Sequence, residues 1–209
     1  FSISKYTGTG SAATIGHGLD KKPDLIICKN LERNDGYWFL YHSALGATKM
    51  LEFNENTASQ TNSQWWNDTE PTADVFTVNV KADNNASGDE HVAYCWHGIP
   101  GYSAFGLYTG NNSGDGAFVQ CGFRPAFVYI KGTHLSDGVL LDSARSPDKH
   151  NVNNKSFHTR QPDGEATDIP IDFLSNGFRN RSTHSSHNSA NDFVWWAFAE
   201  HPFKTARAK

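Results

Sequence analysis

The stretch Pro23-Asp24-Leu25-Ile26-Ile27-Cys28-Lys29 returns 102 residues later (position 125 against position 23) as Pro125-Ala126-Phe127-Val128-Tyr129-Ile130-Lys131. Each copy is a short apolar run that follows a proline, has the length of a strand and ends in lysine. Two more segments repeat at the same offset: Tyr6-Thr7-Gly8 returns as Tyr108-Thr109-Gly110, and 91–96 returns as 193–198. Because three separate segments share one offset, we interpret the chain as an internal duplication.

The composition favours a β-rich core. Among the 209 residues are 14 Phe, 7 Tyr and 6 Trp but a single Met, and aromatic side chains suit pleated surfaces. Helical periodicity never extends beyond about two turns, and the segments between the strand-like runs are rich in turn-forming Gly, Asn, Asp and Ser. We therefore predict an all-β protein of tandem pseudo-symmetric repeats, residues 1–103 and 104–209, with β-sandwich or jelly-roll (concanavalin-like) architecture. Two sandwiches and two halves of one larger sandwich both remain open.

The repeated aromatic strand predicts which face is buried. Its bulky residues fall on alternate positions in both copies, and we expect that face to be the core face. Phe193 and Trp195 lie on the opposite face, so they are our candidates for contact with the other repeat or with another subunit. The alternative is that both faces of this strand are buried within one sandwich. The predicted core residues are Val92, Tyr94, Trp96, Val194, Trp196 and Phe198.

Charge and hydropathy narrow the class of function. The formal net charge of −4 and the absence of a basic stripe argue against a nucleic-acid partner. No apolar run has the length of a membrane span, so we expect no membrane insertion, and no signal peptide is recognisable. Since the chain begins at Phe1, we expect a processed or excised piece of a longer protein.

The three cysteines give no even pairing and no metal-type spacing. Cys28 and Cys95 lie in apolar runs, where the second copy has Ile130 and Ala197. Cysteines that exchange with such residues behave as small hydrophobic side chains. We predict buried free thiols, Cys121 included.

The pair Trp65-Trp66 is the best candidate for a ligand-binding surface. It follows a mostly polar run, precedes Asn67-Asp68, and has no counterpart in the second copy. Aromatic rings stack on sugar faces, while amide and carboxylate groups bind hydroxyls. We therefore predict Trp65, Trp66, Asn67 and Asp68 as ligand-binding residues. In the alternative interpretation, neighbouring strand residues point opposite ways, so one ring fills the core and the other covers it.

Metal, cofactor and catalytic motifs are weak. His184-Ser185-Ser186-His187 would pair two ligands only on a helix, and its neighbours are typical of a loop. Asn111–Gly116 and 163–165 offer oxygen ligands without a calcium-loop register. Asp142 beside Ser143 lacks a nucleophile elbow, and no motif links Glu52 to Asp142 as a glycosidase pair. We expect no metal, no cofactor and no enzymatic activity.

The repeated motif resembles repeat domains of tail-associated proteins (tail fibre or tailspike) of marine bacteriophages. It combines an apolar residue, Tyr-Thr-Gly, Gly-Leu or Gly-Phe, a proline, an apolar strand ending in Lys, and an Asn-rich turn before an aromatic strand. The resemblance covers essentially the whole chain, although 87–88 of the first copy reads Ser-Gly and 189–190 of the second reads Ser-Ala. The positions are Ile3, Tyr6–Gly8, Gly18-Leu19, Pro23–Lys29, Asn85–Gly88 and Val92–Trp96, then Phe105, Tyr108–Gly110, Gly122-Phe123, Pro125–Lys131, Asn188–Asn191 and Val194–Phe198.

This resemblance implies a β-rich virion appendage that is extracellular once assembled. Its expected partners are a host cell-surface glycan or receptor and other virion or fibre subunits, with a homo-oligomer, a trimer, in the full-length protein. The leading hypothesis is receptor or glycan binding. The alternatives are a purely structural virion component, such as a fibre part or capsid decoration, and, less favoured, a polysaccharide depolymerase.

Overall fold

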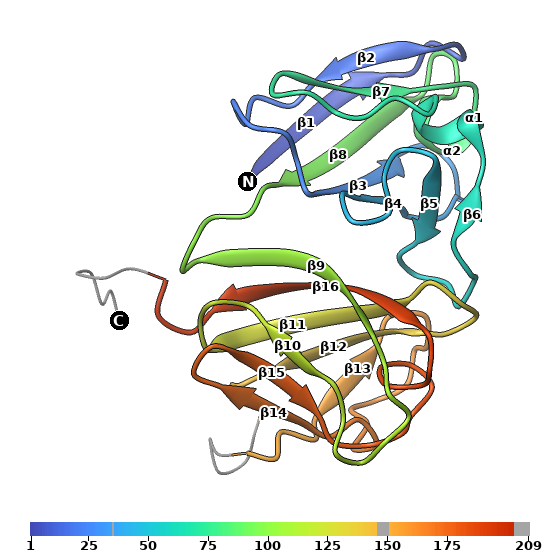
Figure 1. The fold of residues 1–209 in the computed structure, drawn as a ribbon. Coiled ribbons are helices and arrows are strands. Elements are labelled where there is room, and N and C mark those ends of the chain that lie inside the picture. Colours follow the sequence, from blue (N-terminus) through green and yellow to red (C-terminus); the bar gives the residue numbers. More distant parts are fainter. Residues whose placement is uncertain (35, 146–150, 203–209) are drawn as a thin grey trace. The chain divides into compact units, whose positions relative to one another are not determined.

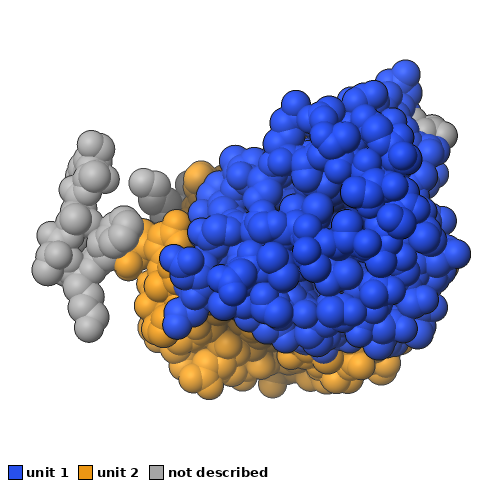
Figure 2. All heavy atoms as spheres, turned by 90° about the horizontal axis from the view of Figure 1, so that it is seen from above, with its two compact units in different colours: residues 1–97 blue, residues 98–209 orange. Residues whose placement is uncertain are grey.

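The computed structural model describes residues 1–34, 36–145 and 151–202. The chain divides into two compact units, Phe1–His97 and Gly98–Lys209 (Figure 2). The sequence repeat places the boundary between residues 103 and 104, whereas the structure places it between His97 and Gly98, before β9 begins. Strands dominate both units, so the prediction of an all-β fold is confirmed.

Unit 1 consists of two antiparallel sheets and two single helical turns (Figure 1). The larger sheet has the order β1-β8-β3-β4-β5-β6, and β2 pairs with β7 to form the smaller one. Within the described residues, no helix is long and apolar enough to cross a membrane. The bounds are β1 (Ser2–Thr7), β2 (Ala13–Gly16), β3 (Leu25–Asn30), β4 (Phe39–His42), β5 (Lys49–Glu52), β6 (Gln60–Thr61), α1 (Ser63–Trp66), β7 (Val75–Val78), α2 (Ala82–Asn85) and β8 (Glu90–Trp96).

Unit 2 has a five-stranded antiparallel sheet of order β13-β12-β11-β16-β9 and a three-stranded sheet of order β10-β15-β14 (Figure 1). Apolar side chains of both sheets form one cluster, as in a sandwich. The bounds are β9 (Ser103–Thr109), β10 (Phe118–Gln120), β11 (Pro125–Gly132), β12 (Gly138–Asp142), β13 (Ser156–His158), β14 (Ile171–Leu174), β15 (Gly177–Asn180) and β16 (Asp192–Ala199).

The segments that match in sequence occupy matching strands. β8 lies between β1 and β3, and β16 lies between β9 and β11. Their registers also agree, since Tyr6 pairs with His91 and Tyr108 pairs with Phe193. The units differ elsewhere: α1 and β6 have no counterpart in the described part of unit 2, whereas the small sheet of unit 2 has a third strand.

The prediction of the core face of the aromatic strand is wrong in unit 1. In β8 the side chains buried against the second sheet are His91, Ala93 and Cys95, while Tyr94 lies on the other face and stacks with Trp38. Small residues suffice on the core side of β8 because β7 and α1 fill that core with large rings. Bulk alone therefore does not identify the buried face of a strand.

In β16 both faces are buried, as the alternative interpretation predicts: Val194 and Trp196, on the predicted core face, are 0% and 5% exposed. Phe193 and Trp195, predicted as outward contacts, are 0% and 5% exposed and belong to the sandwich core. Phe193 stacks on Tyr108 with ring centroids 5.3 Å apart, and Trp195 meets Phe178 edge-on at 5.7 Å. These rings are required for the core of unit 2 and offer no contact surface.

A buried asparagine holds the loop that follows the first Tyr-Thr-Gly motif. The Asn85 side chain accepts a hydrogen bond from the Thr9 N–H (2.8 Å). Its amide group donates to the Ser11 carbonyl (2.6 Å) and to the Asn79 carbonyl (2.7 Å). Asn85 is fully buried and ties the loop after β1 to the segment before β8. We call this arrangement the asparagine clamp.

Unit 2 contains the same clamp at Asn188. This side chain accepts from the Asn111 N–H (3.2 Å) and donates to the carbonyls of Ser113 and Ser182, both at 2.8 Å. The motif tyrosine completes the arrangement in both units, since Tyr6 donates to the Asn84 carbonyl and Tyr108 to the His187 carbonyl. The motif tyrosine therefore has a structural role in both units.

The three cysteines are free, as the sequence predicts. Cys28 and Cys95 are buried in the core of unit 1, and Cys121 is partly buried. Burial raises the pKa of Cys95 and of Cys121 to about 12. Thiols with such values are protonated at neutral pH, so they are inert packing residues.

Candidate functional site

The Trp65-Trp66 pair lies in a helical turn. The Asn62 side chain caps the start of α1 by accepting from the Gln64 N–H (2.9 Å), and Asn67 ends it with a left-handed φ of 53°. Neighbouring residues on a helix point about 100° apart, whereas on a strand they point to opposite faces. Both indole rings can therefore enter the same core.

Both rings do so, and the prediction of an exposed aromatic surface is wrong. Trp65 is 3% exposed and Trp66 is 2% exposed. Trp66 packs edge-on against Tyr41 and Phe76, and Trp65 packs against Phe39 with centroids 5.6 Å apart. The alternative of one core ring and one covering ring also fails, because it assumed a strand.

Asn67 and Asp68 are exposed, but they act as the end of α1. Both adopt left-handed backbone conformations, with φ of 53° and 47°. The Asn67 carboxamide oxygen accepts from the Asn79 amide at 3.1 Å. Short polar side chains tolerate such conformations better than others, so the pair is explained without a ligand. Neither residue lines the pocket described next.

A pocket of about 420 Å³ adjoins Trp65 in unit 1. Ligand sites typically enclose roughly 300–1,000 Å³, so this volume suits a small molecule or one segment of a larger one. Trp65 is the only one of the four predicted binding residues that lines it. The pocket combines aromatic and charged side chains: Arg33, Tyr37, Phe39, Glu52, Gln60, Trp65, Lys81 and Asp83.

Trp65 and Phe39 form the aromatic base of the pocket. The Lys81 ammonium lies 4.7 Å from the centre of the Trp65 ring, a distance at which cation and ring attract each other. The indole Nε1 of Trp65 is buried and has no hydrogen-bond partner among the described residues. Trp65 therefore positions Lys81 at the pocket.

The loop after β3 supplies an accessible ring. Lys29, the lysine that ends the repeated strand, donates to the Gly36 carbonyl (3.0 Å) and to the Arg33 carbonyl (3.5 Å). This tether holds Arg33 and Tyr37 at the pocket. Tyr37 is 43% exposed and meets Phe39 edge-on at 6.5 Å. Tyr37 thus has the exposed aromatic character that the sequence assigns to the tryptophans.

Carboxylate and amide groups complete the lining. Glu52 is buried at the end of β5, and its carboxylate accepts from the Thr57 hydroxyl at 2.7 Å. Asp83 is half-buried in the single turn of α2. In the part of the chain that the structure describes, the Asp83 carboxylate and the Gln60 amide have no hydrogen-bond partner. The pocket therefore offers both acceptors and donors to a polar ligand.

Unit 2 gathers histidines around a carboxylate. His158 Nε2 lies 3.7 Å from Asp168 Oδ1, and His184 Nε2 lies 3.6 Å from Asp168 Oδ2. His184 also stacks on His187, with centroids 6.0 Å apart. Across residues 1–34, 36–145 and 151–202, however, no group of three or more His, Cys, Asp or Glu residues is arranged to hold a metal ion.

His187 differs from its neighbours because it is fully buried. Burial and, to a lesser extent, the charge of His184 lower the pKa of His187 to about 3, against the opposing effect of Asp168. Its Nε2 lies 3.3 Å from the Ser182 hydroxyl. The imidazole is therefore neutral in the folded chain at neutral pH.

This buried imidazole makes stability depend on pH. The unfolded chain binds a proton below the ordinary pKa of 6.5, whereas the folded chain does so only near pH 3. The free energy of unfolding therefore keeps its full value above pH 6.5 and falls as the pH drops towards 3. At pH 4 it is lower by about 3 kcal/mol. Asn84 stands at the matching position of unit 1, and His187→Asn should remove this loss. We expect the difference in unfolding free energy between pH 7 and pH 4 to shrink by that amount.

Denaturant unfolding at the two pH values measures the effect. The exposed His201 provides the control, because His201→Asn should leave the pH dependence of the parent unchanged. Equal pH dependence in the parent and in His187→Asn would contradict the assignment.

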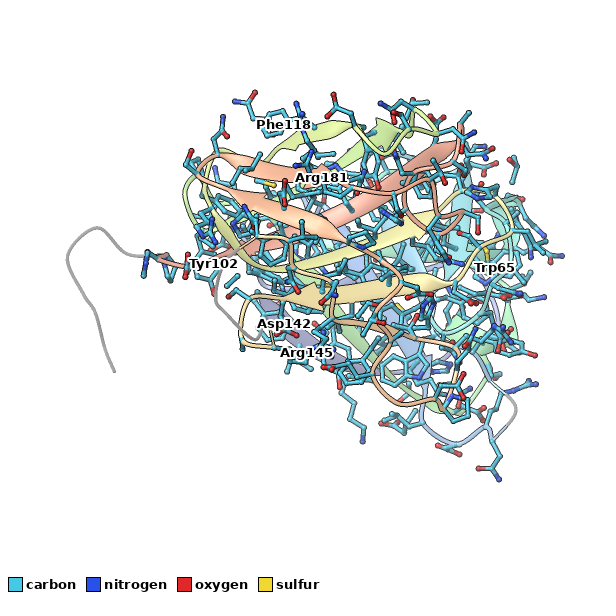
Figure 3. The ribbon with its side chains drawn as sticks, turned by 90° about the horizontal axis from the view of Figure 1, so that it is seen from below. Trp65, Tyr102, Phe118, Asp142, Arg145 and Arg181 are labelled. Carbon is cyan, nitrogen blue, oxygen red and sulfur yellow. The ribbon has the colours of Figure 1, made fainter. Side chains whose placement is uncertain are left out.

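The candidate catalytic pairs are not assembled. Glu52 belongs to unit 1 and Asp142 to unit 2, and Asp142 pairs with Arg145 at 2.6 Å (Figure 3). In the two candidate calcium segments, Asp115 pairs with Arg179 at 2.7 Å and Glu165 with Lys155 at 2.9 Å. These carboxylates serve as partners of protein cations.

Comparison with known proteins identifies one family, described as "Domain of unknown function (DUF7483)", which matches residues 1–202. The match extends over both units and includes every residue of the pocket. No curated protein and no solved structure matches the chain. The function must therefore be inferred from the chemistry of the pocket.

Proposed function

The chain belongs to this family of unknown function, and from that premise we propose that it is a glycan-binding module of a virion tail appendage. In this proposal the pocket of unit 1 holds a sugar residue of a host cell-surface glycan. Residues 98–145 and 151–202 of unit 2 contain no counterpart of α1, which carries Trp65, so binding is assigned to unit 1. The module binds and does not catalyse.

The composition of the pocket supports the glycan part of the proposal. Sugars present apolar faces, which stack on aromatic rings, and edges of hydroxyl groups, which need donors and acceptors close together. Tyr37 is an accessible ring of the lining, Phe39 and Trp65 add aromatic surface, and charged and amide side chains form the rest. This combination in one pocket is the observation that carries the proposal.

The virion part rests on the repeated motif that resembles tail-associated phage proteins. Such an appendage would act outside the cell, assembled with other fibre subunits, and as a trimer in the full-length protein. A purely structural role would leave the pocket without a ligand, whereas a depolymerase would use it for hydrolysis. Both alternatives make predictions that differ from those of binding.

A glycan array probed with the full chain tests binding, and calorimetry with the retained oligosaccharide measures its affinity. Tyr37→Ala should weaken binding about tenfold, equivalent to about 1.4 kcal/mol, because the accessible stacking ring is lost. Phe118→Ala is the matched control (Figure 3), since Phe118 is 41% exposed but belongs to β10 of unit 2. Its affinity should equal that of the parent.

The outcomes separate the three hypotheses. If the parent chain retains no glycan on the array, the structural role is favoured. New reducing ends after incubation with the bound polysaccharide would favour the depolymerase. Stable retention without cleavage, weakened by Tyr37→Ala alone, supports the binding module.

A further inference from the structure

The charges around the pocket limit what kind of sugar it can hold. Arg33 and Lys81 carry the positive charges of the lining, and Glu52 and Asp83 carry the negative ones. Their formal charges cancel. Sites for anionic ligands instead accumulate cations that are not offset by carboxylates, often with arginine in bidentate contact. We infer that the ligand is a neutral sugar residue bound through its hydroxyl groups; this inference rests on the proposed function.

Each charged group has a role that suits hydroxyls. A carboxylate accepts hydrogen bonds, an ammonium donates them, and a hydroxyl can do both. The Asp83 carboxylate is not engaged by any described residue, and the Lys81 ammonium lies 4.7 Å from the centre of the Trp65 ring. Lys81 and Asp83 stand two positions apart where α2 begins, so adjacent hydroxyls of one sugar ring could meet a donor and an acceptor.

Glu52 opposes an acidic sugar most strongly. It is 8% exposed, and its carboxylate is held by the Thr57 hydroxyl at 2.7 Å. A ligand carboxylate brought near this group would meet a like charge where solvent screens poorly. A neutral hydroxyl would instead donate a charge-assisted hydrogen bond to it. The buried glutamate therefore selects against uronic and sialic-type residues.

The test compares matched ligands on the full chain. Neutral oligosaccharides are arrayed beside the same oligosaccharides oxidised to uronic acids at carbon 6. We expect retention of a neutral oligosaccharide and at least about tenfold weaker binding of its oxidised form. Affinity for the neutral ligand should change less than about twofold between 0.05 M and 0.5 M NaCl, because no net charge is paired on binding.

A variant tests the role of the carboxylates. Asp83→Asn keeps the shape of the side chain but gives the lining a net positive charge, so the ratio of neutral to oxidised binding should fall at least about fivefold. Asp74→Asn is the control, because Asp74 is exposed in unit 1 and does not line the pocket. It should leave the ratio unchanged.

The failures of the two proposals can be told apart. Stronger binding of the oxidised ligands, or loss of binding in 0.5 M NaCl, overturns the neutral-sugar inference while glycan binding stands. An unchanged ratio in Asp83→Asn overturns the assigned role of the carboxylates. Absence of binding to both ligand sets overturns the glycan-binding function itself, and with it the inference.

Discussion

Asn85→Ala should lower the free energy of unfolding by about 4 kcal/mol, since removing one buried partner costs about 1–3 kcal/mol for each polar group left unsatisfied. The substitution removes three hydrogen bonds at once: the Thr9 N–H and the Asn79 carbonyl lose the partner in Asn85, and the Ser11 carbonyl keeps only the Thr9 hydroxyl. The Asn85 side chain itself is fully buried, so the alanine variant leaves a space in the interior of unit 1 besides the lost hydrogen bonds. Asn188→Ala should have an effect of similar size in unit 2.

Denaturant unfolding followed by circular dichroism measures both losses. Asn176→Ala is the control: Asn176 is exposed, and such substitutions usually change stability by less than about 0.5 kcal/mol. Asn85→Asp should not restore stability, because a carboxylate keeps the acceptor but places negative charge against two carbonyl oxygens. A loss below about 1 kcal/mol in both alanine variants would contradict the clamp.

Gly8→Ala should cost about 3 kcal/mol or prevent unit 1 from folding, because a side chain must be forced into a filled position. A Cβ atom at Gly8 would lie 2.0 Å from the Ala86 carbonyl oxygen. The backbone cannot move aside freely, since the Gly8 N–H donates to Asp89 and its carbonyl accepts from Gly88. Gly110 is in the same situation, with Ser189 O at 2.1 Å.

The matched control for this prediction is Gly16→Ala. Gly16 lies in the same unit, its Cβ would meet nothing within 4 Å, and its φ is not left-handed. Alanine at a compatible position stabilises a chain by about 0.4–1 kcal/mol. The melting temperatures of the two variants should therefore move in opposite directions. Equal shifts would show that the contact with Ala86 does not limit the site.

The positions of the main strands could be predicted from the sequence, because the repeated segments mark them. This signal does not depend on which face of a strand is buried. The offset of 102 residues identified β3 with β11 and β8 with β16. The buried face could not be predicted, because it depends on the facing sheet. Ala93 and Cys95 face the core where Trp66 and Phe76 already fill it.

The candidate site was predicted only at Trp65. Asn62 before Ser63-Gln64 is a helix N-cap signal, and recognising it would have shown that both indoles can face one core. The rest of the pocket comes from elements that lie far apart in the sequence, such as Arg33 after β3 and Lys81 before α2. No spacing pattern could bring these residues together, because their proximity arises from the fold.

The position of β8 in the sheet has a consequence for synthesis. β8 lies between β1 and β3, yet it is the last strand of unit 1 to leave the ribosome. Until Trp96 has emerged, β1 has no neighbour in the sheet and β3 keeps an open edge. A sheet whose central strand pairs with residues far away in the sequence folds slowly. Its strand edges stay unprotected until that pairing is complete. A ribosomal pause shortly after unit 1 would therefore protect the nascent chain from aggregation.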